Sequence, residues 1–342
     1  MKNLSTQATT QQRLAEIITN FKNRRVLIIG DAIADRFVYG NISRVSREAP
    51  VFILRHEHTE TLPGGAANCA VNVAALGAAV SLLSVTGNDE SGQQLRGKLV
   101  SAGVNTASLL VSDSWKTTTK ERILAGQAHS TKQQVIRIDY EGSQLENEGL
   151  RRSIAETLST NIADCDVVII SDYNYGVVDE NLIERIRKHA SAHSLPVLVD
   201  SRFRLSSFTD FTAATPNEDE LEQLIGEAIQ DQEHLESSAF QLNKALNTEA
   251  LLVTRGGQGM MLVQRNQQPL HIPAVGAAQP VDVTGAGDTV IATFALAIAS
   301  KASFLEAASL ANYAGGLVVM KRGTASVSAD DLRESILSET EA

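Results

Sequence analysis

Short apolar runs that alternate with amphipathic stretches constrain the fold of this 342-residue chain more than any other feature. The first run, Val26–Ile29, ends at Gly30, and similar runs follow at 80–85, 167–170, 196–199 and 250–253. Helical spacing of apolar residues is found at 14–21, 66–76, 91–101, 181–193, 217–225, 285–300, 304–320 and 330–337. This alternation predicts parallel βαβ units, with helices on both faces of a central, mainly parallel sheet.

Two regions, 37–62 and 109–140, interrupt the alternation with strand-like patterns. We expect them to pair as a small antiparallel sheet that acts as a lid over the carboxyl ends of the core strands, where ligands bind in such folds. Residues 1–23 are expected to form a polar tail and a short helix, residues 24–337 one α/β domain, and residues 338–342 a tail.

Composition excludes several classes of function. The formal net charge of -10 argues against broad binding to nucleic acid, because an acidic chain repels phosphate backbones. No apolar stretch approaches the length that spans a bilayer, and Met1–Thr10 lacks the apolar core of a signal peptide. The only two cysteines, Cys69 and Cys165, suggest a reducing compartment. The expected location is therefore the cytoplasm, without membrane contact.

The strongest chemical signal is the segment 281–289, Val-Asp-Val-Thr-Gly-Ala-Gly-Asp-Thr, directly before a long apolar helix. The small residues Gly285–Gly287 let the backbone approach a ligand closely, and the amides at the helix start would form an anion hole. Asp288 beside a bound anion is electrostatically awkward, which suggests proton abstraction. The alternative is a glycine-rich turn in which the helix dipole favours Asp288. The flanking Asp282 and Thr284 favour the functional interpretation.

Two weaker signals lie nearer the amino terminus. The run Pro63-Gly64-Gly65-Ala66-Ala67-Asn68 opens a predicted helix, and Asn68 offers a donor and an acceptor to a polyol. An ordinary helix start explains this run equally well. Gly30-Asp31-Ala32-Ile33-Ala34-Asp35 follows the first strand, where its carboxylates suit vicinal hydroxyls or simply cap loops. No Gly-x-Gly-x-x-Gly follows that strand, which argues against a dinucleotide-dependent oxidoreductase.

Taken in order, these motifs resemble those of the ribokinase-like sugar kinases, the PfkB group. The likeness spans about residues 26–327, with Gly-Gly-x-x-Asn early, Asn217-x-x-Glu220 midway, Thr254-x-Gly-Gly-x-Gly next and Gly-Ala-Gly-Asp late. It implies a three-layer α/β sandwich with a mainly parallel central sheet and a small β-strand lid. It also implies an ATP-dependent phosphotransferase with an alcohol group as acceptor.

The resemblance further implies a role for each matching residue. Asp288 would be the base that deprotonates the sugar hydroxyl, while the anion hole of Gly285, Ala286 and Gly287 would hold the charge of the transferring phosphoryl group. Glu220 would bind Mg²⁺ through water, and Asp282 and Thr284 match positions that bind a monovalent cation such as K⁺. The sugar would contact Asp35, Gly64, Gly65, Asn68, Arg137 and Asp172. The nucleotide would contact Asn217, Glu220, Thr254, Gly256, Gly259 and Asn312.

Within the group, the chain most resembles the heptose 7-phosphate kinases of lipopolysaccharide precursor synthesis. The likeness rests on residues 40–51, Ser171-Asp172-Tyr173, Lys120-x-Arg122 and Arg137-x-Asp139. Because that acceptor already carries a phosphate, cations near the lid are expected to bind it, with Arg44, Arg47, Lys120, Arg122 and Arg137 as candidates.

The chain also departs from the heptose kinases. Tyr175 stands where those kinases usually have a lysine, and Ser201-Arg202-Phe203-Arg204 replaces their usual Pro-Lys start. Either Arg202 or Arg204 would then supply the missing cation. The second, nucleotidyltransferase half that many heptose kinases carry is not expected here, since the sequence ends at Ala342.

Several alternatives stay open. The acceptor could be a ketohexose phosphate, a free pentose or hexose, or a nucleoside. A non-catalytic regulator that binds sugar or nucleotide is a second possibility, although a binder has no need for Asp288. A structural partner protein is a third, without a supporting feature. An exposed edge of the lid invites pairing between subunits, so a homodimer through the lid strands is expected.

Overall fold

The computed structural model describes residues 2–127, 130–142, 147–276, 279–321 and 323–338. Within these residues the largest sheet has the strand order β13-β12-β11-β10-β9-β8-β1-β4-β5. The strands are parallel from β5 to β11, and β12 and β13 are antiparallel to their neighbours, so the predicted mainly parallel sheet is confirmed. Their bounds are β1 Arg25–Gly30, β4 Ala79–Gly87, β5 Leu109–Ser112, β8 Val167–Asp172, β9 Val197–Ser201, β10 Ala213–Ala214, β11 Ala250–Thr254, β12 Met260–Gln264 and β13 Leu270–Ile272.

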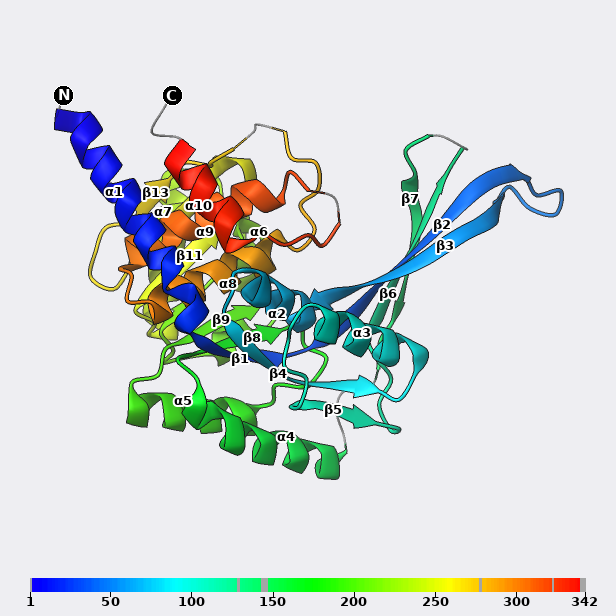
Figure 1. The fold of residues 1–342 in the computed structure, drawn as a ribbon, viewed down its shortest axis with the longest axis horizontal. Coiled ribbons are helices and arrows are strands. Elements are labelled where there is room, and N and C mark those ends of the chain that lie inside the picture. The colour runs from blue at the N-terminus through cyan, green and yellow to red at the C-terminus, as the bar shows by residue number, and fades with distance from the viewer. Residues whose placement is uncertain (1, 128–129, 143–146, 277–278, 322, 339–342) are drawn as a thin grey trace.

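Helices cover both faces of this sheet (Figure 1). Side chains alternate along β1, so that Val26 and Ile28 pack in one apolar cluster and Leu27 and Ile29 in the other. The first cluster is completed by α1 Lys2–Thr19, α2 Ala66–Ala75, α3 Glu90–Ser101, α8 Ala286–Ala299, α9 Phe304–Val318 and α10 Ala329–Ser338. The second is completed by α4 Glu148–Asn161, α5 Glu180–His193, α6 Glu218–Ile225 and α7 Gln232–Leu246. The three-layer sandwich is therefore confirmed.

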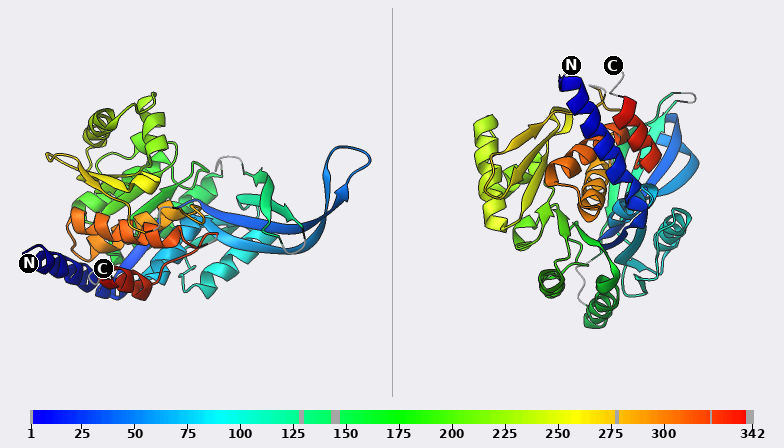
Figure 2. Two further views of the ribbon diagram at one scale, coloured as in Figure 1. Left: turned by 90° about the horizontal axis from the view of Figure 1, so that it is seen from above. Right: turned by 60° about the vertical axis from the view of Figure 1, so that its left-hand side comes forward.

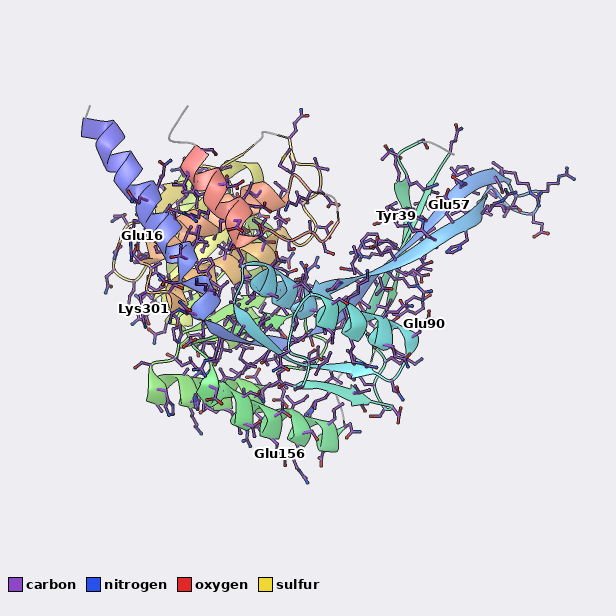
Figure 3. The ribbon with its side chains drawn as sticks, in the orientation of Figure 1. Glu16, Tyr39, Glu57, Glu90, Glu156 and Lys301 are labelled. Carbon is purple, nitrogen blue, oxygen red and sulfur yellow. The ribbon has the colours of Figure 1, made fainter. Side chains whose placement is uncertain are left out.

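A smaller sheet extends from one end of the core, and its long hairpin projects well beyond the helices (Figures 1 and 2). Its order is β3-β2-β6-β7, and Tyr39 and Glu57 lie on the projecting hairpin (Figure 3). The predicted purely antiparallel pairing is wrong in one place. Strands β2 and β6 pair in parallel because both leave the core in the same direction, with Ala34 opposite Thr119. The bounds are β2 Ala32–Val45, β3 Phe52–Gly65, β6 Thr119–Gly126 and β7 Gln133–Tyr140.

The predicted bounds of the lid also need correction. Residues 109–112 form β5 of the main sheet rather than the lid, because Leu109 is buried and the segment pairs with β4. The hairpin strands begin at Ala32 and end at Gly65, so they continue without a break into the core at both ends.

The amino-terminal residues are more regular than expected. The helix predicted from residue 14 begins at Lys2, because no proline or glycine interrupts residues 2–19 and the buried Leu14, Ile17 and Ile18 fix its last turns on the core. Helices α4 and α7 were not predicted. Short 3₁₀ turns lie at 21–23, 162–164, 205–207 and 256–258. No helix among the described residues has the length and apolarity to cross a membrane.

Candidate active site

The candidate residues gather at the carboxyl ends of the central strands, where the sheet topology reverses. Strands β4 and β5 lie on one side of β1, and β8 to β11 lie on the other. Asp31 follows β1, Tyr173 follows β8, and Asp200 lies near the end of β9. Such a switch point is the usual place for a ligand site in an open parallel sheet.

The Gly-Ala-Gly-Asp segment forms the start of α8. Gly285 is the N-cap residue with φ 76°, and a Cβ at this position would lie 2.5 Å from Asn68 Nδ2, so only glycine fits. Asp288 lies in the first helical turn and is only 4% exposed. Asn68 Nδ2 donates to Asp288 Oδ2 at 2.7 Å, and the Tyr173 hydroxyl donates to Asp288 Oδ1 at 3.4 Å. Each carboxylate oxygen thus has one donor.

A buried polar network supports Asn68 from behind. Asn68 lies in the first turn of α2, which begins where β3 ends at Gly65. Asn72, one turn later, donates to the Asn68 carbonyl at 3.0 Å, and the Thr289 hydroxyl donates to Asn72 Oδ1 at 2.8 Å. Helices α2 and α8 are therefore joined by hydrogen bonds on both sides of the carboxylate, which fixes its position.

The predicted sugar-binding residues lie beside this carboxylate. Asp35 on β2 is buried and forms an ion pair with Arg122 on β6. Gly64 lies against Asp35, and a Cβ there would collide with its carboxylate. Burial raises the pKa of Asp288 most, and the negative charge of Asp35 raises it further. The structure therefore brings together Asp35, Gly64, Asn68 and Asp288.

Burial raises the pKa of Asp288 to about 7. The hydrogen bond from Asn68 lowers it, as do the Tyr173 hydroxyl and the charge of Lys120, but none of these outweighs desolvation. Asp31 is similar: burial and the nearby Asp172 raise its pKa to about 6, although the amides of Tyr173, Tyr175 and Val177 donate to it. A carboxylate with a pKa near 7 is suited to general base catalysis at neutral pH.

This raised pKa predicts a pH-dependent difference in stability between wild type and Asp288→Asn. The pKa is above its unfolded value, so the stability that Asp288 contributes is fully present below pH 4 and is lost as pH rises through 7. Relative to the variant, wild type should lose about 2–4 kcal/mol of unfolding free energy between pH 4 and pH 8. Urea unfolding of both proteins across this range measures the difference, and a constant difference would contradict the burial argument. Asp31 is present in both proteins and cancels.

A pocket of about 180 Å³ lies on the other side of the Gly-Ala-Gly turn. It brings together residues predicted to contact a nucleotide, namely Thr254, Gly256, Gly259 and Asn312, and its wall includes Ala286 and Gly287. A Cβ on Gly256, Gly257 or Gly287 would have no neighbour within 4 Å, so these glycines leave room along the pocket. Asn312 is oriented by donating to the Pro273 carbonyl at 2.7 Å. Ala286 and Gly287, which directly precede Asp288 at the start of α8, therefore line this pocket.

Asn217 and Glu220 form a reciprocal capping box at the start of α6. Asn217 Oδ1 accepts from the Glu220 amide at 2.8 Å, and Glu220 Oε2 accepts from the Asn217 amide at 2.9 Å. Asp200 lies close to Glu220; burial raises the pKa of Asp200, and the charge of Glu220 raises it further. Two adjacent, poorly solvated carboxylates are a donor set that suits Mg²⁺ bound mainly through water and phosphate. No cluster of three or more potential metal-binding side chains occurs in the described parts of the chain.

Asp282 accepts hydrogen bonds from two loops, its own and the one that contains Gly323. Its Oδ1 accepts from the Thr284 amide and its Oδ2 from the Gly323 amide, both at 2.9 Å. Burial opposes ionisation, yet these hydrogen bonds lower the pKa of Asp282 overall. The carboxylate stays charged next to the anion-hole turn, in a position where a monovalent cation is electrostatically favoured.

A second pocket, of about 420 Å³, opens between the lid and the core. Its cations are Lys120 and Arg137 from the lid and Arg202 from the loop after β9, and Tyr173 and Tyr175 also line it. Arg137 pairs with Asp139, whereas within the described residues neither Lys120 nor Arg202 forms an ion pair. We call this the cationic pocket.

The other candidate cations are placed elsewhere. Arg44 and Arg47 are exposed near the tip of the projecting hairpin, and Arg122 is paired with Asp35. Arg204 binds Asp172 Oδ1 at 2.8 Å, while the Ser201 hydroxyl donates to Asp172 Oδ2 at 2.7 Å. Asp172 is thus fully buried with both oxygens engaged by the protein.

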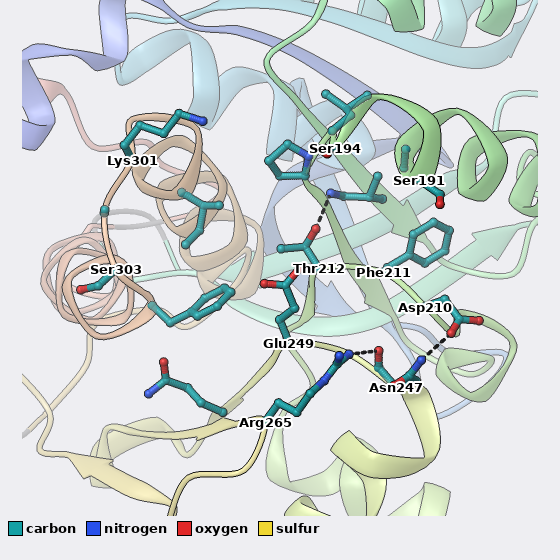
Figure 4. Close-up of a pocket in the computed structure, with 18 of the residues that line it drawn as sticks. Ser191, Ser194, Asp210, Phe211, Thr212, Asn247, Glu249, Arg265, Lys301 and Ser303 are labelled. Carbon is teal, nitrogen blue, oxygen red and sulfur yellow. Dashed lines mark hydrogen bonds between the residues drawn. The ribbon is translucent and has the colours of Figure 1, made fainter.

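Larger hollows lie away from these residues. One of about 850 Å³ is found at the amino-terminal ends of β9, β10 and β11 (Figure 4). There Asn247 donates to Asp210 at 2.7 Å, and Arg265 donates to the Asn247 carbonyl at 2.7 Å. The opposite edge of the sheet carries the buried carboxylates, so size alone does not identify the site.

The family model of the pfkB family carbohydrate kinases matches residues 23–331. The chain belongs to this family. The resemblance inferred from the motifs is confirmed, and the pfkB assignment also confirms the predicted enzyme class, an ATP-dependent phosphotransferase.

The chain is also similar to curated proteins and to solved structures. The chain is 38% identical to the bifunctional protein HldE of Desulfatibacillum aliphaticivorans and 40% identical to that of Caulobacter vibrioides, in each case over 93% of this chain. It spans only 64% and 65% of the lengths of those two relatives. Phosphofructokinase-2 from Escherichia coli aligns with a TM-score of 0.76 at 20% identity, over 93% of this chain and 100% of that one. At this identity the structural match shows the fold alone.

Three residues of the site have contacts that were not expected from the sequence, although Asp31 was a candidate for binding vicinal hydroxyls and Tyr173 was part of a motif. Tyr173 contacts Asp288, Asp200 lies beside Glu220, and Asp31 holds the loop after β8. All three follow or end buried parallel strands, so position at a strand's carboxyl end was the available signal.

Proposed function

We propose that this chain phosphorylates a sugar phosphate from ATP, with D-glycero-D-manno-heptose 7-phosphate and its 1-hydroxyl as the best candidate. The observation that carries the proposal is the position of Asp288, buried between the predicted sugar-binding residues and the pocket of Thr254, Gly256 and Asn312. The relatives named HldE support the resemblance to heptose 7-phosphate kinases. Residues 24–337 would form one kinase domain.

In this proposal Asp35, Gly65 and Asn68 hold the sugar while the lid excludes water. Asp288 removes the proton from the acceptor hydroxyl, and the amides at the start of α8 take the charge that develops on the transferring phosphoryl group. Asn217 and Glu220 would hold Mg²⁺ through water, and the ion would supply positive charge that offsets the charge of the ATP phosphates. The turn at Gly285–Gly287 would then lie between the two bound substrates, as in-line transfer requires, because Ala286 and Gly287 line the pocket proposed for ATP and Asp288 is held by Asn68.

The cationic pocket supports a phosphorylated acceptor. Lys120, Arg137 and Arg202 line a space that also contains Tyr173, whose hydroxyl contacts Asp288. A phosphate in this pocket would leave the far end of the same sugar beside the base. Because Arg204 is committed to Asp172, Arg202 is the residue that compensates for the lysine that Tyr175 replaces. We accordingly assign Asp172 to the support of Arg204 rather than to the sugar.

The acceptor is tested by ADP release from ATP·Mg²⁺ with a panel of sugars, each with and without K⁺. The panel contains heptose 7-phosphates, fructose phosphates, free hexoses and pentoses, and nucleosides. Selective turnover of a heptose 7-phosphate is expected, and stimulation by K⁺ would support a cation near Asp282 and Thr284. Turnover of another sugar would keep the kinase chemistry and refute the heptose assignment, while ATP binding without any turnover would favour a regulator.

A second prediction concerns the affinity of the cationic pocket for the phosphate of the acceptor. Arg202→Gln and Arg137→Gln should raise KM for the phosphorylated acceptor about 10- to 100-fold, because each loses a charge-assisted hydrogen bond, with little change in KM for ATP. Arg47→Gln is the matched control, since Arg47 is exposed on the hairpin. A rise in KM with Arg47→Gln but not with Arg202→Gln would move the phosphate site to the hairpin.

We also propose a homodimer through the lid. Strand β7 is exposed along its whole length and lies at the edge of its sheet. Exposed apolar side chains gather on the lid strands and the hairpin tip, including Val45, Val51, Phe52, Val135, Ile136, Ile138 and Tyr140. Apolar surface next to an unpaired strand edge is favourable for pairing with a second copy.

A further inference from the structure

The lid and the buried carboxylate are connected through one tyrosine. Lys120 lies on lid strand β6, and its Nζ is 5.3 Å from the centre of the Tyr173 ring. Tyr173 follows core strand β8, and its hydroxyl donates to Asp288 Oδ1 at 3.4 Å. A continuous path of contacts therefore runs from a lid cation to an aromatic ring and then to the carboxylate.

A second aromatic ring, that of Tyr175, also lies close to the Lys120 ammonium group. The Tyr175 ring centre lies 5.9 Å from Lys120 Nζ, and the Tyr175 hydroxyl donates to Glu141 Oε1 at 2.9 Å. Two rings attract an ammonium group through their negatively charged faces. Burial lowers the pKa of Lys120, which means that the ammonium group is partly desolvated between the two rings. Nearby Asp35 raises this pKa. The favourable contacts that offset this desolvation exist only while β6 lies on the core.

Few groups stabilise the ionised form of Asp288. Asn68 occupies Oδ2, so Tyr173 is the donor to Oδ1. After burial, which raises the pKa of Asp288 most, Asp35 raises it further, whereas Asn68, Tyr173 and Lys120 lower it. The titratable or charged groups that face this region are Cys69 on α2, Asp35 on β2, Lys120 and Arg122 on β6, Tyr173 after β8 and Asp200 on β9.

We propose that Tyr173 is a positioning residue through which lid closure ionises and orients Asp288. When β6 seats Lys120 on the Tyr173 ring, the tyrosine hydroxyl is held against Oδ1 and the positive charge stabilises the carboxylate. When the lid moves away, the cation leaves and the carboxylate of Asp288 loses this stabilisation. The base would thus be most effective while the lid lies on the core, which would limit transfer of phosphate to water. The inference rests on the proposed role of Asp288 as the base.

Direct titration of Asp288 tests the coupling without any substrate. Protein labelled with ¹³C at the aspartate carboxyl groups is titrated by NMR, and the Asp288 signal is assigned by its absence in Asp288→Asn. Tyr173→Phe should move the Asp288 midpoint upward by about half a pH unit or more, because the carboxylate loses a donor. Lys120→Gln should move it in the same direction, and Lys120→Arg should restore it.

Tyr175→Phe is the matched control, since it removes the same atom from a ring that contacts Lys120 but not Asp288. It should leave the Asp288 midpoint in place. Circular dichroism and the unfolding midpoint of each variant establish that it is folded. Unchanged Asp288 midpoints in both Tyr173→Phe and Lys120→Gln would overturn the proposal.

Kinetics then separate the coupling from the proposed function. With the best acceptor of the panel, the acid limb of kcat against pH should shift upward in Tyr173→Phe and Lys120→Gln by the same amount as the NMR midpoint. If no acceptor is turned over by wild type, the proposed function fails while the titration still decides the coupling. A shifted midpoint with an unshifted acid limb would show that the link exists but does not act on the reaction.

Discussion

Asp288→Asn is expected to lower kcat about 10²- to 10⁴-fold and to leave ATP affinity nearly unchanged. The loss follows from removing the proposed general base, whose pKa of about 7 suits proton transfer at neutral pH. Asparagine has the same shape, and its amide oxygen can still accept the hydrogen bond from Asn68. The pocket proposed to bind the nucleotide is lined by Ala286 and Gly287 and not by Asp288, so ATP binding measured by calorimetry should persist.

The matched control is Asp330→Asn, because Asp330 is exposed on α10, far along the chain from any candidate residue. It should keep wild-type kcat. Activity of Asp288→Asn within a few fold of wild type would show that another group accepts the proton. A parallel loss of ATP binding would instead point to a disturbed α8. Urea unfolding of Asp288→Asn would show such a disturbance as a lower free energy of unfolding.

Gly285→Ala should lower kcat about 10²- to 10³-fold, the size expected when the proposed anion hole is displaced. The Cβ would lie 2.5 Å from Asn68 Nδ2, and φ of 76° is strained for alanine. Asn68 must then move, which breaks its hydrogen bond to Asp288 and shifts the amides at the start of α8. Steady-state kinetics with saturating ATP and acceptor measure the effect.

Gly97→Ala provides the comparison for this substitution. Gly97 lies in the middle of α3, is exposed, and a Cβ there has no neighbour within 4 Å. Alanine should therefore leave kcat unchanged and stabilise the helix by about 0.5–1 kcal/mol. Wild-type kcat in Gly285→Ala would mean that neither the turn conformation nor the Asn68 contact is needed for transfer.

The elements that could be predicted from the sequence are those with a local, regular spacing of apolar residues. Period-2 and period-3.6 spacing gave α2, α3, α5, α6, α8, α9 and α10 to within two residues at each end, because each has a clear apolar stripe. Helix α4 has buried Ile154 and Leu158 one turn apart, but polar residues dominate the rest of its sequence. The direction of pairing between β2 and β6 depends on how two distant segments leave the core, and no local pattern records that.

The residues of the candidate site also fall into two groups, those that could be predicted from local sequence and those that could not. The glycine-rich turn and Asn68 could be found from residue type and spacing, since each lies at a helix start. The distinction between Arg202 and Arg204 could not, because both follow β9 within three residues and only packing sends Arg204 to Asp172 and leaves Arg202 in the cationic pocket. Tyr173 looked like one residue of a motif until its hydroxyl was placed beside Asp288.

The first and last helices of the chain pack side by side (Figure 1). Leu14, Ile17 and Ile18 of α1 belong to the same apolar cluster as Leu332 and Ile336 of α10. Arg13 adds an ion pair to Glu306 of α9 at 3.1 Å. During synthesis the amino-terminal helix must wait until more than 300 residues have followed it, so this layer closes late and folding of the layer is slow. Until then the apolar face of α1 lacks its partner in α10.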